Sequence, residues 1–212
     1  MTHQQRRERV FKGPVVSEHL LQLFDDGESL AEGVGEFLNE GWSAGHALLV
    51  VARPQAWASI SQRLTALGCD VSGATASGRL VVLDAAATLA SLSRNGLPLA
   101  DLFAEQVGVL VRRLNEGHPA GLRIYGEMVD LLATQGDFSA AEQLEAMWNL
   151  LGTESPFTLL CGYSSANFVD DRAAMALHTI CCAHTQTTVK PADLLGAWLL
   201  SGRQPRATTR SA

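Results

Sequence analysis

The chain has 212 residues, of which 47% are hydrophobic and 18% are charged, and its formal net charge is −6 at pH 7. This length and composition predict one globular domain and exclude a mainly disordered protein. No apolar run approaches the ~18 residues of a membrane span, and the polar first dozen residues lack the apolar core of a signal peptide. We therefore expect a cytoplasmic protein that contacts no membrane.

The two ends of the chain are rich in basic residues. These are Arg6, Arg7, Arg9 and Lys12 near the start, and Arg203, Arg206 and Arg210 near the end. The body between them is more acidic than the net charge, and an acidic body repels a phosphate backbone, so we expect no direct contact with nucleic acid. We predict a basic tail over residues 1–14, one domain over 15–190, and a C-terminal extension over 191–212 whose end is disordered.

Short runs rich in Val, Leu and Ile alternate with longer segments of helical spacing. Strands are expected over residues 17–24, 46–52, 79–84, 122–127 and 157–163. Helices are expected over residues 29–39, 54–67, 86–93, 98–115, 128–134, 139–151 and 170–184. This alternation is typical of βαβ units, so it predicts a three-layer α/β/α sandwich with a mainly parallel sheet.

Three residues mark boundaries of the helices predicted over residues 29–39 and 54–67. Pro54 suits the first position of a helix, where its missing N–H costs nothing. Gly41 and Gly68 suit the position just after a helix, where φ is positive. We expect one helix to end at each of these glycines.

The sequence has none of the common motifs of catalysis or metal binding. The two lysines, Lys12 and Lys190, stand outside any glycine loop, and neither the phosphate loop G-x-x-x-x-G-K-[ST] nor G-x-G-x-x-G is present. The cysteines Cys69, Cys161, Cys181 and Cys182 have no metal-ligand spacing, and Cys161 stands in an apolar strand typical of core. We expect reduced thiols, no metal, no cofactor and no enzymatic activity.

Polar residues follow the predicted strands, where the carboxyl ends of a parallel sheet gather ligands. Arg53, Asp84 and Glu127 stand at such positions. Asp84 equally suits the N-cap of the following helix. For Glu127 two roles stay open, because a buried carboxylate needs partners: anchoring a ligand, or a structural hydrogen bond to a helix N-terminus.

Aromatic residues accompany these polar groups. Tyr125 and Tyr163 fall near strand ends, and Trp148 lies beside the apolar stripe of its helix, which is itself typical of core. They predict a cavity with aromatic walls for a small, mostly apolar ligand. With His19 as a further polar group, the candidate ligand-binding residues are Glu127, Tyr125, Trp148, Tyr163, Asp84, Arg53 and His19.

The run from Arg123 to Tyr163 resembles the signature of the MEDS family, the methanogen/methylotroph, DcmR-type sensory domain. The matching residues are Tyr125, Gly126, Glu127, Met128, Leu131, Leu132, Gly136, Ala140, Ala141, Leu144, Glu145, Trp148, Asn149, Phe157, Leu159, Leu160, Cys161 and Tyr163. The upstream half is also similar, with His19, the turn at Gly41, and residues 78–84. The resemblance covers residues 15–185.

The resemblance implies a fold related to RecA-like and circadian-clock ATPase domains that has lost the phosphate loop. It also implies a sensory role in bacterial transcription or two-component regulation, with small, hydrocarbon-derived compounds as ligands. We expect a stand-alone domain that binds a small molecule and signals through a regulatory partner, a kinase or a DNA-binding regulator, on another chain. A homodimer is an alternative to a monomer.

Two other functions stay open. One is a nucleotide-binding relative with a degenerate phosphate site, in which Arg53 replaces the lysine and Asp84 holds Mg²⁺. The other is a docking protein that binds no ligand.

Overall fold

The computed structural model describes residues 17–188. The predicted tail over 1–14 and the predicted extension over 191–212 lie outside these residues. Among the described helices, none combines the length and the apolar character needed to cross a membrane.

A single six-stranded sheet forms the centre of the domain, in the order β3-β2-β6-β7-β1-β8, with every neighbouring pair parallel. The strands are β1 (Glu18–Phe24), β2 (Ala47–Ala52), β3 (Leu80–Asp84), β6 (Leu122–Gly126), β7 (Thr158–Ser164) and β8 (Gln186–Thr188). The five predicted strands are confirmed to within one or two residues. The sixth, β8, was not predicted, because its three residues are polar and lie at an edge of the sheet.

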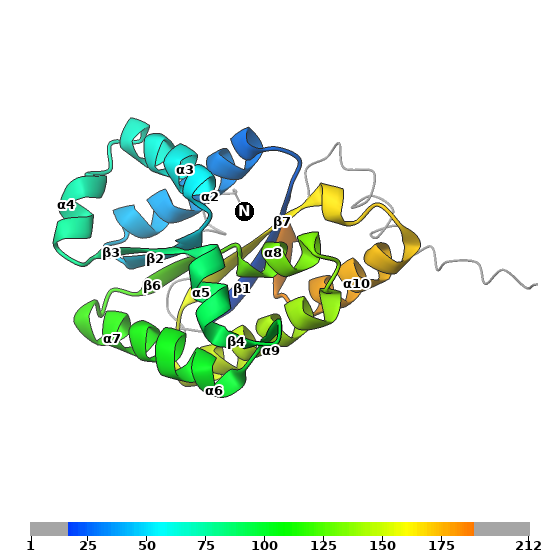
Figure 1. Cartoon of the computed structure of the whole chain (residues 1–212). Coiled ribbons are helices and arrows are strands. Elements are labelled where there is room, and N and C mark those ends of the chain that lie inside the picture. The colour runs from blue at the N-terminus through cyan, green and yellow to red at the C-terminus, as the bar shows by residue number, and fades with distance from the viewer. Residues whose placement is uncertain (1–16, 189–212) are drawn as a thin grey trace, which may run out of the picture.

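Helices cover both faces of this sheet (Figure 1). One face carries α2 (Gly27–Ser43), α3 (Pro54–Ala66) and α4 (Val71–Ala76). The other carries α5 (Ala85–Leu92), α6 (Ala100–Phe103), α7 (Val109–Gly117), α8 (Met128–Thr134), α9 (Phe138–Glu154) and α10 (Asp171–Cys182). The three-layer α/β/α sandwich is therefore confirmed.

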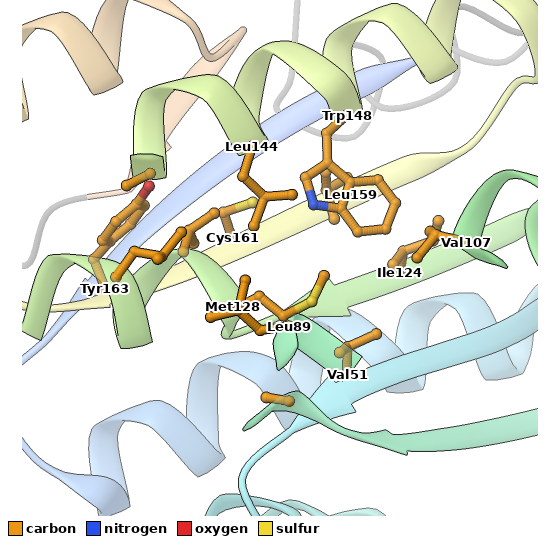
Figure 2. Close-up of a cluster of buried hydrophobic side chains, with 14 of the residues drawn as sticks. Val51, Leu89, Val107, Ile124, Met128, Leu144, Trp148, Leu159, Cys161 and Tyr163 are labelled. Carbon is orange, nitrogen blue, oxygen red and sulfur yellow. The ribbon is translucent and has the colours of Figure 1, made fainter. Parts of the chain in front are cut away.

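Each face of the sheet has its own hydrophobic core. All six residues of β2 are buried, and because strand side chains alternate, Val50 packs under α2 and α3 while Val51 packs on the opposite face. Figure 2 shows the core on the face covered by α5 to α10, in which Leu144 and Trp148 of α9 face the side chains of Ile124 and Leu159 from the sheet. These two cores fix the positions of the loops at both edges of the sheet.

The single helix predicted over residues 98–115 is confirmed in outline, since residues 100–117 are helical throughout, but it begins two residues later and contains a π-helical turn. A two-stranded hairpin comes first, formed by β4 (Ser93–Arg94) and β5 (Leu97–Pro98). Its loop is Asn95-Gly96 with φ of 53° and 81°, the conformation that favours this dipeptide in tight hairpins. The helix that follows is divided into α6 and α7 by a π-helical turn over Ala104–Gly108.

The two predicted glycine stops have different outcomes. Gly68 follows α3 with φ +88°, so that prediction is confirmed. Gly41 is wrong as a stop, because α2 continues to Ser43 and the positive φ falls on Gly45. Gly41 instead makes room for Arg123, whose Cδ would lie 2.6 Å from a Cβ at this position.

Candidate functional site

The carboxyl ends of β2 and β6 lie side by side at a point where the chain connections diverge. From β2 the chain passes through α3 to β3, towards one edge of the sheet, whereas from β6 it passes through α8 and α9 to β7 in the other direction. Because α3 and α8 cover opposite faces, their N-termini lie on the two sides of the junction between these strands. In open α/β sheets ligands commonly bind at such a junction.

Glu127 lies at this junction directly after β6, with only 1% of its surface exposed. Its Oε2 accepts hydrogen bonds from the backbone N–H of Arg53 at 2.6 Å and from the guanidinium Nε at 3.3 Å. Its Oε1 accepts a hydrogen bond from the hydroxyl of Tyr125 at 2.9 Å. Because Arg53 is the N-cap residue of α3, the structural role predicted for Glu127 at a helix N-terminus has the required geometry.

Asp130, in the first turn of α8, is the second carboxylate of the site and is 1% exposed. Its Oδ2 contacts Nη2 of Arg53, and its Oδ1 accepts hydrogen bonds from the Ser164 backbone N–H at 2.8 Å and from Asn167 Nδ2 at 2.7 Å. Asp130 is not among the site residues predicted from the sequence. The signal for it was its spacing of three residues from Glu127, which places both on the same helix turn.

Arg53 is held between the two carboxylates, and about a third of its side chain, 32%, is exposed. Burial opposes its charge, but the Asp130 hydrogen bond and the charges of Asp130 and Glu127 outweigh that effect and raise the pKa of Arg53. Two carboxylates and one guanidinium leave the network with a net negative charge. The network joins the start of α3, the start of α8 and the segment after β7.

Asp84 ends β3 at the same edge, in register with Ala52 of β2. Its carboxylate accepts a hydrogen bond of 2.7 Å from the backbone N–H of Ala87 and is solvent exposed. It is therefore the N-cap of α5, the alternative role that the sequence predicted.

The predicted aromatic residues do not surround one cavity, so that prediction is wrong. Tyr125 is buried in the core under α2 and α3, whereas Tyr163 and Trp148 are buried on the opposite face of the sheet (Figure 2). Side chains alternate between the two faces along a strand, and this alternation places Tyr125 and Tyr163 on opposite faces of the sheet.

Trp148 lines a hollow of about 370 Å³ at the amino edge of the sheet, together with His19. The indole ring packs edge-on against Phe103 and Phe157, with ring centroids 4.9 Å and 6.0 Å apart. The hollow is also lined by Ser17, Glu18, Asn149, Gly152, Thr153 and Thr185. Two of the predicted ligand residues thus meet at the edge opposite to Arg53 and Glu127.

A second group of titratable side chains lies behind this hollow, around the carboxylate of Glu145. Tyr163 donates a hydrogen bond of 2.7 Å to Glu145 Oε1, and His184 Nε2 lies 3.4 Å from the same oxygen. His19 Nε2 lies 3.1 Å from Oε2, and Cys161 Sγ lies 3.3 Å from it. Among the described residues, His19, Glu145, Cys161 and His184 form a group with the donor atoms to hold a metal ion.

The charge of Glu145 controls the protonation of its neighbours. Burial favours the neutral form of Glu145, but His184 and His19 outweigh it and hold the pKa of Glu145 well below its usual range. Burial also opposes a charged His184, yet Glu145 raises the pKa of this histidine. Burial and the Glu145 charge both raise the pKa of Cys161 and of Tyr163, so these two groups are neutral in the protein on its own.

The fold and the site define a parallel α/β/α domain with a buried ionic network at its carboxyl edge and no lysine-bearing phosphate loop in its sequence. A family model described as MEDS, the MEthanogen/methylotroph, DcmR Sensory domain, matches residues 18–185. The chain belongs to this family, as the resemblance in the sequence indicated, and the family supports a sensory or regulatory role. No curated protein matches the chain.

Proposed function

We propose that this chain is a non-catalytic sensory domain that binds a small molecule at the carboxyl edge of the sheet, between β2 and β6. The observation that carries the proposal is the network of Arg53, Glu127 and Asp130 at the point where the chain connections diverge. Buried charges are costly unless paired, so carboxylates at this position favour a role in which their partner is exchanged.

The network has the connections needed to transmit binding. Glu127 bonds the N-cap residue of α3, while Asp130 bonds Ser164 at the end of β7 and Asn167 in the segment after it. A ligand that displaces Arg53 from either carboxylate changes the contacts of three elements together. A signal requires such a difference in contacts between the free and the bound state.

The charge of the network favours certain ligands. Two carboxylates against one guanidinium attract a cationic or hydrogen-bond-donating compound, and the small hydrocarbon-derived compounds implied by the family resemblance include such molecules. The nucleotide alternative is disfavoured, because it requires Arg53 to face phosphates and Asp84 to hold Mg²⁺. Arg53 is instead paired with two carboxylates, and Asp84 caps α5.

The output of the domain follows from the same proposal. We propose that occupancy is read by a regulatory protein on another chain, a kinase or a DNA-binding regulator, in bacterial transcription or two-component regulation. A second copy of the chain is the alternative partner.

The test is a binding screen of the purified full chain with short-chain alcohols and amines, read by thermal shift and then by calorimetry. A compound bound at the network should lose affinity at least tenfold in Glu127→Gln and in Arg53→Lys. Asp84→Asn is the matched control, since Asp84 lies at the same edge outside the network, and it should keep the wild-type affinity. Equal affinity in all four proteins, or no binding by any compound, contradicts the proposal.

A further inference from the structure

The cluster around Glu145 brings together donor atoms from four separate parts of the chain. His19 comes from β1, Glu145 from α9, Cys161 from β7, and His184 from the segment after α10. One ligand atom of each residue lies within 4.8 Å of those of the other three. The side chains of His19, Glu145 and His184 are 7%, 1% and 0% exposed, and Cys161 is fully buried.

Three of the distances within the cluster are close to those around a tetrahedral metal ion, and the four ligand atoms all lie within 4.8 Å of one another. With metal–ligand bonds of about 2.0–2.3 Å, neighbouring ligand atoms of a zinc site lie about 3.3–3.6 Å apart. His19 Nε2, Cys161 Sγ and Glu145 Oε2 form a triangle with sides of 3.1, 3.3 and 3.3 Å. His184 Nε2 faces the other oxygen of Glu145 at 3.4 Å.

Hydrogen bonds outside the cluster orient both imidazole rings towards its centre. His184 Nδ1 lies 2.7 Å from the carbonyl oxygen of Ile180, which can only accept, so Nδ1 carries the proton. Asn149 Nδ2 donates to the carbonyl oxygen of Ala183, which turns Asn149 Oδ1 towards His19 Nδ1 at 2.9 Å. Each neutral ring therefore presents the lone pair of Nε2 inwards, the arrangement typical of metal-binding histidines.

One polar atom of the cluster is not satisfied by the others. His184 Nε2 is buried and has no hydrogen-bond partner, because its contact with Glu145 lacks hydrogen-bond geometry. With both imidazoles neutral, two lone pairs, a carboxylate and a sulfur atom face the same region, and all four attract a cation. This is an observation separate from the spacing, and it also indicates a ligand.

We propose that His19, Glu145, Cys161 and His184 form a binding site for a divalent transition metal of the zinc type. Two imidazoles and a thiolate favour such a metal over Mg²⁺ or Ca²⁺, which prefer oxygen ligands. Four protein ligands make a closed set, which is typical of structural sites. The ion fixes α9 and the segment leading into β8 against β1 and β7, on the face of the sheet that α9 covers.

The hollow at the amino edge gives the ion a path to this site. His19 and Asn149 line the hollow, so His19 connects it with the buried cluster. Binding releases the proton of Cys161, and that of His184 where its imidazole is charged, to solvent, and the thiolate and the neutral imidazole then bond the metal. No oxidation or reduction is involved.

The experiment uses the tag-free full chain, stripped with a chelator and titrated with Co²⁺ and then Zn²⁺. We expect one equivalent of Co²⁺, with visible absorption typical of tetrahedral cobalt and a near-ultraviolet thiolate-to-cobalt band. Zn²⁺ should displace Co²⁺ and raise the melting temperature, since an ion that binds only the folded state stabilises it.

Matched variants locate the ligands. Cys161→Ser should abolish the thiolate band, and His184→Gln should lower Co²⁺ affinity at least tenfold. Cys182→Ser and His178→Gln should change neither property, because these donors lie on the exposed side of α10. If the ligand variants do not fold, X-ray absorption of the wild-type zinc complex should show one sulfur and three nitrogen or oxygen neighbours.

Three results would overturn the proposal. One is the absence of stoichiometric binding to the stripped protein, which would leave the cluster as a buried ion pair of histidine and glutamate. Another is a cobalt spectrum that is lost in Cys182→Ser or His178→Gln and kept in Cys161→Ser, which indicates adventitious surface binding. The third is a metal sphere without sulfur.

Discussion

The hydroxyl of Tyr125 donates a hydrogen bond of 2.9 Å to Oε1 of Glu127. Tyr125 lies on the face of β6 that α2 and α3 cover, and this hydrogen bond places the carboxylate of Glu127 beside it. Tyr125 is fully buried, and burial together with the charge of Glu127 raises the pKa of its phenol. The hydroxyl therefore remains a proton donor to the network at the carboxyl edge.

Gly162 makes room for this hydroxyl, so Gly162→Ala should be destabilising. A Cβ at Gly162 would lie 2.8 Å from Tyr125 Oη, which is buried and bonded to Glu127 and so has nowhere to move. We expect the free energy of unfolding to fall by about 1–3 kcal/mol, the usual cost of overpacking a core.

A double-mutant cycle with Tyr125→Phe, measured by urea denaturation, tests this mechanism. Without the phenol oxygen, Gly162→Ala should lower the free energy of unfolding by clearly less than it does in the wild-type background. The same cost in both backgrounds would show that the hydroxyl is not what excludes a larger residue.

Glu127→Gln should lower the stability of the domain. The neutral amide has an NH2 group in place of one carboxylate oxygen, so Tyr125 can no longer donate to that atom, and the charge that pairs with Arg53 is lost. We expect a loss of about 2 kcal/mol in the free energy of unfolding, or about 5 °C in the melting temperature. In the control Asp84→Asn the melting temperature should stay nearly unchanged, because asparagine caps a helix about as well as aspartate.

The same variant separates the two roles of Glu127. If Glu127 anchors a ligand, affinity falls together with stability in Glu127→Gln. A drop of more than about 5 °C in the melting temperature of the free protein, with unchanged ligand affinity, would leave only the structural role.

The fold could be predicted because its central strands are short apolar runs buried on both faces. In β2 every residue is apolar, and the run stops at Arg53. The hydropathy of β8 carries no such signal, because its residues pair with β1 at the sheet edge and bury little apolar surface. The hairpin that precedes residue 100 and the π-helical turn in the helix that follows carry no signal in the apolar spacing.

The site at the carboxyl edge could be predicted in part for a related reason. Arg53 and Glu127 follow adjacent parallel strands, so the order of the sheet brings them together. The cluster around Glu145 could not be found in this way. His19 and His184 are far apart in sequence, and only the pairing of β1 with β7 and β8 brings them near each other.

Alanine substitutions should distinguish Gly68, which is needed for its positive φ, from Gly41, which is needed for the space that Arg123 occupies. Gly68→Ala should cost about 1–2 kcal/mol from backbone strain, because φ is +88° and there is open space around the position. Gly41→Ala should be destabilising through Arg123, whose guanidinium donates a hydrogen bond of 2.6 Å to the Phe37 carbonyl oxygen.

The background Arg123→Ala tests this difference by thermal denaturation. In this background the loss of stability caused by Gly41→Ala should be smaller, and the loss caused by Gly68→Ala should be unchanged. A cost at Gly41 that persists without the Arg123 side chain would contradict the role assigned to this glycine.

The protein should neither hydrolyse nor tightly bind ATP. Triphosphate charge would meet Asp84 and the carboxylates of Glu127 and Asp130, while Arg53 is already paired with the latter two and the sequence offers no loop lysine. Calorimetry with ATP and Mg²⁺ should give no heat beyond dilution, and phosphate release should equal that of buffer. Arg53→Ala is the informative variant, because a nucleotide site built on Arg53 would lose its affinity in that protein. A micromolar, Mg²⁺-dependent isotherm in the wild type that disappears in Arg53→Ala would replace the sensory proposal with a nucleotide-binding one.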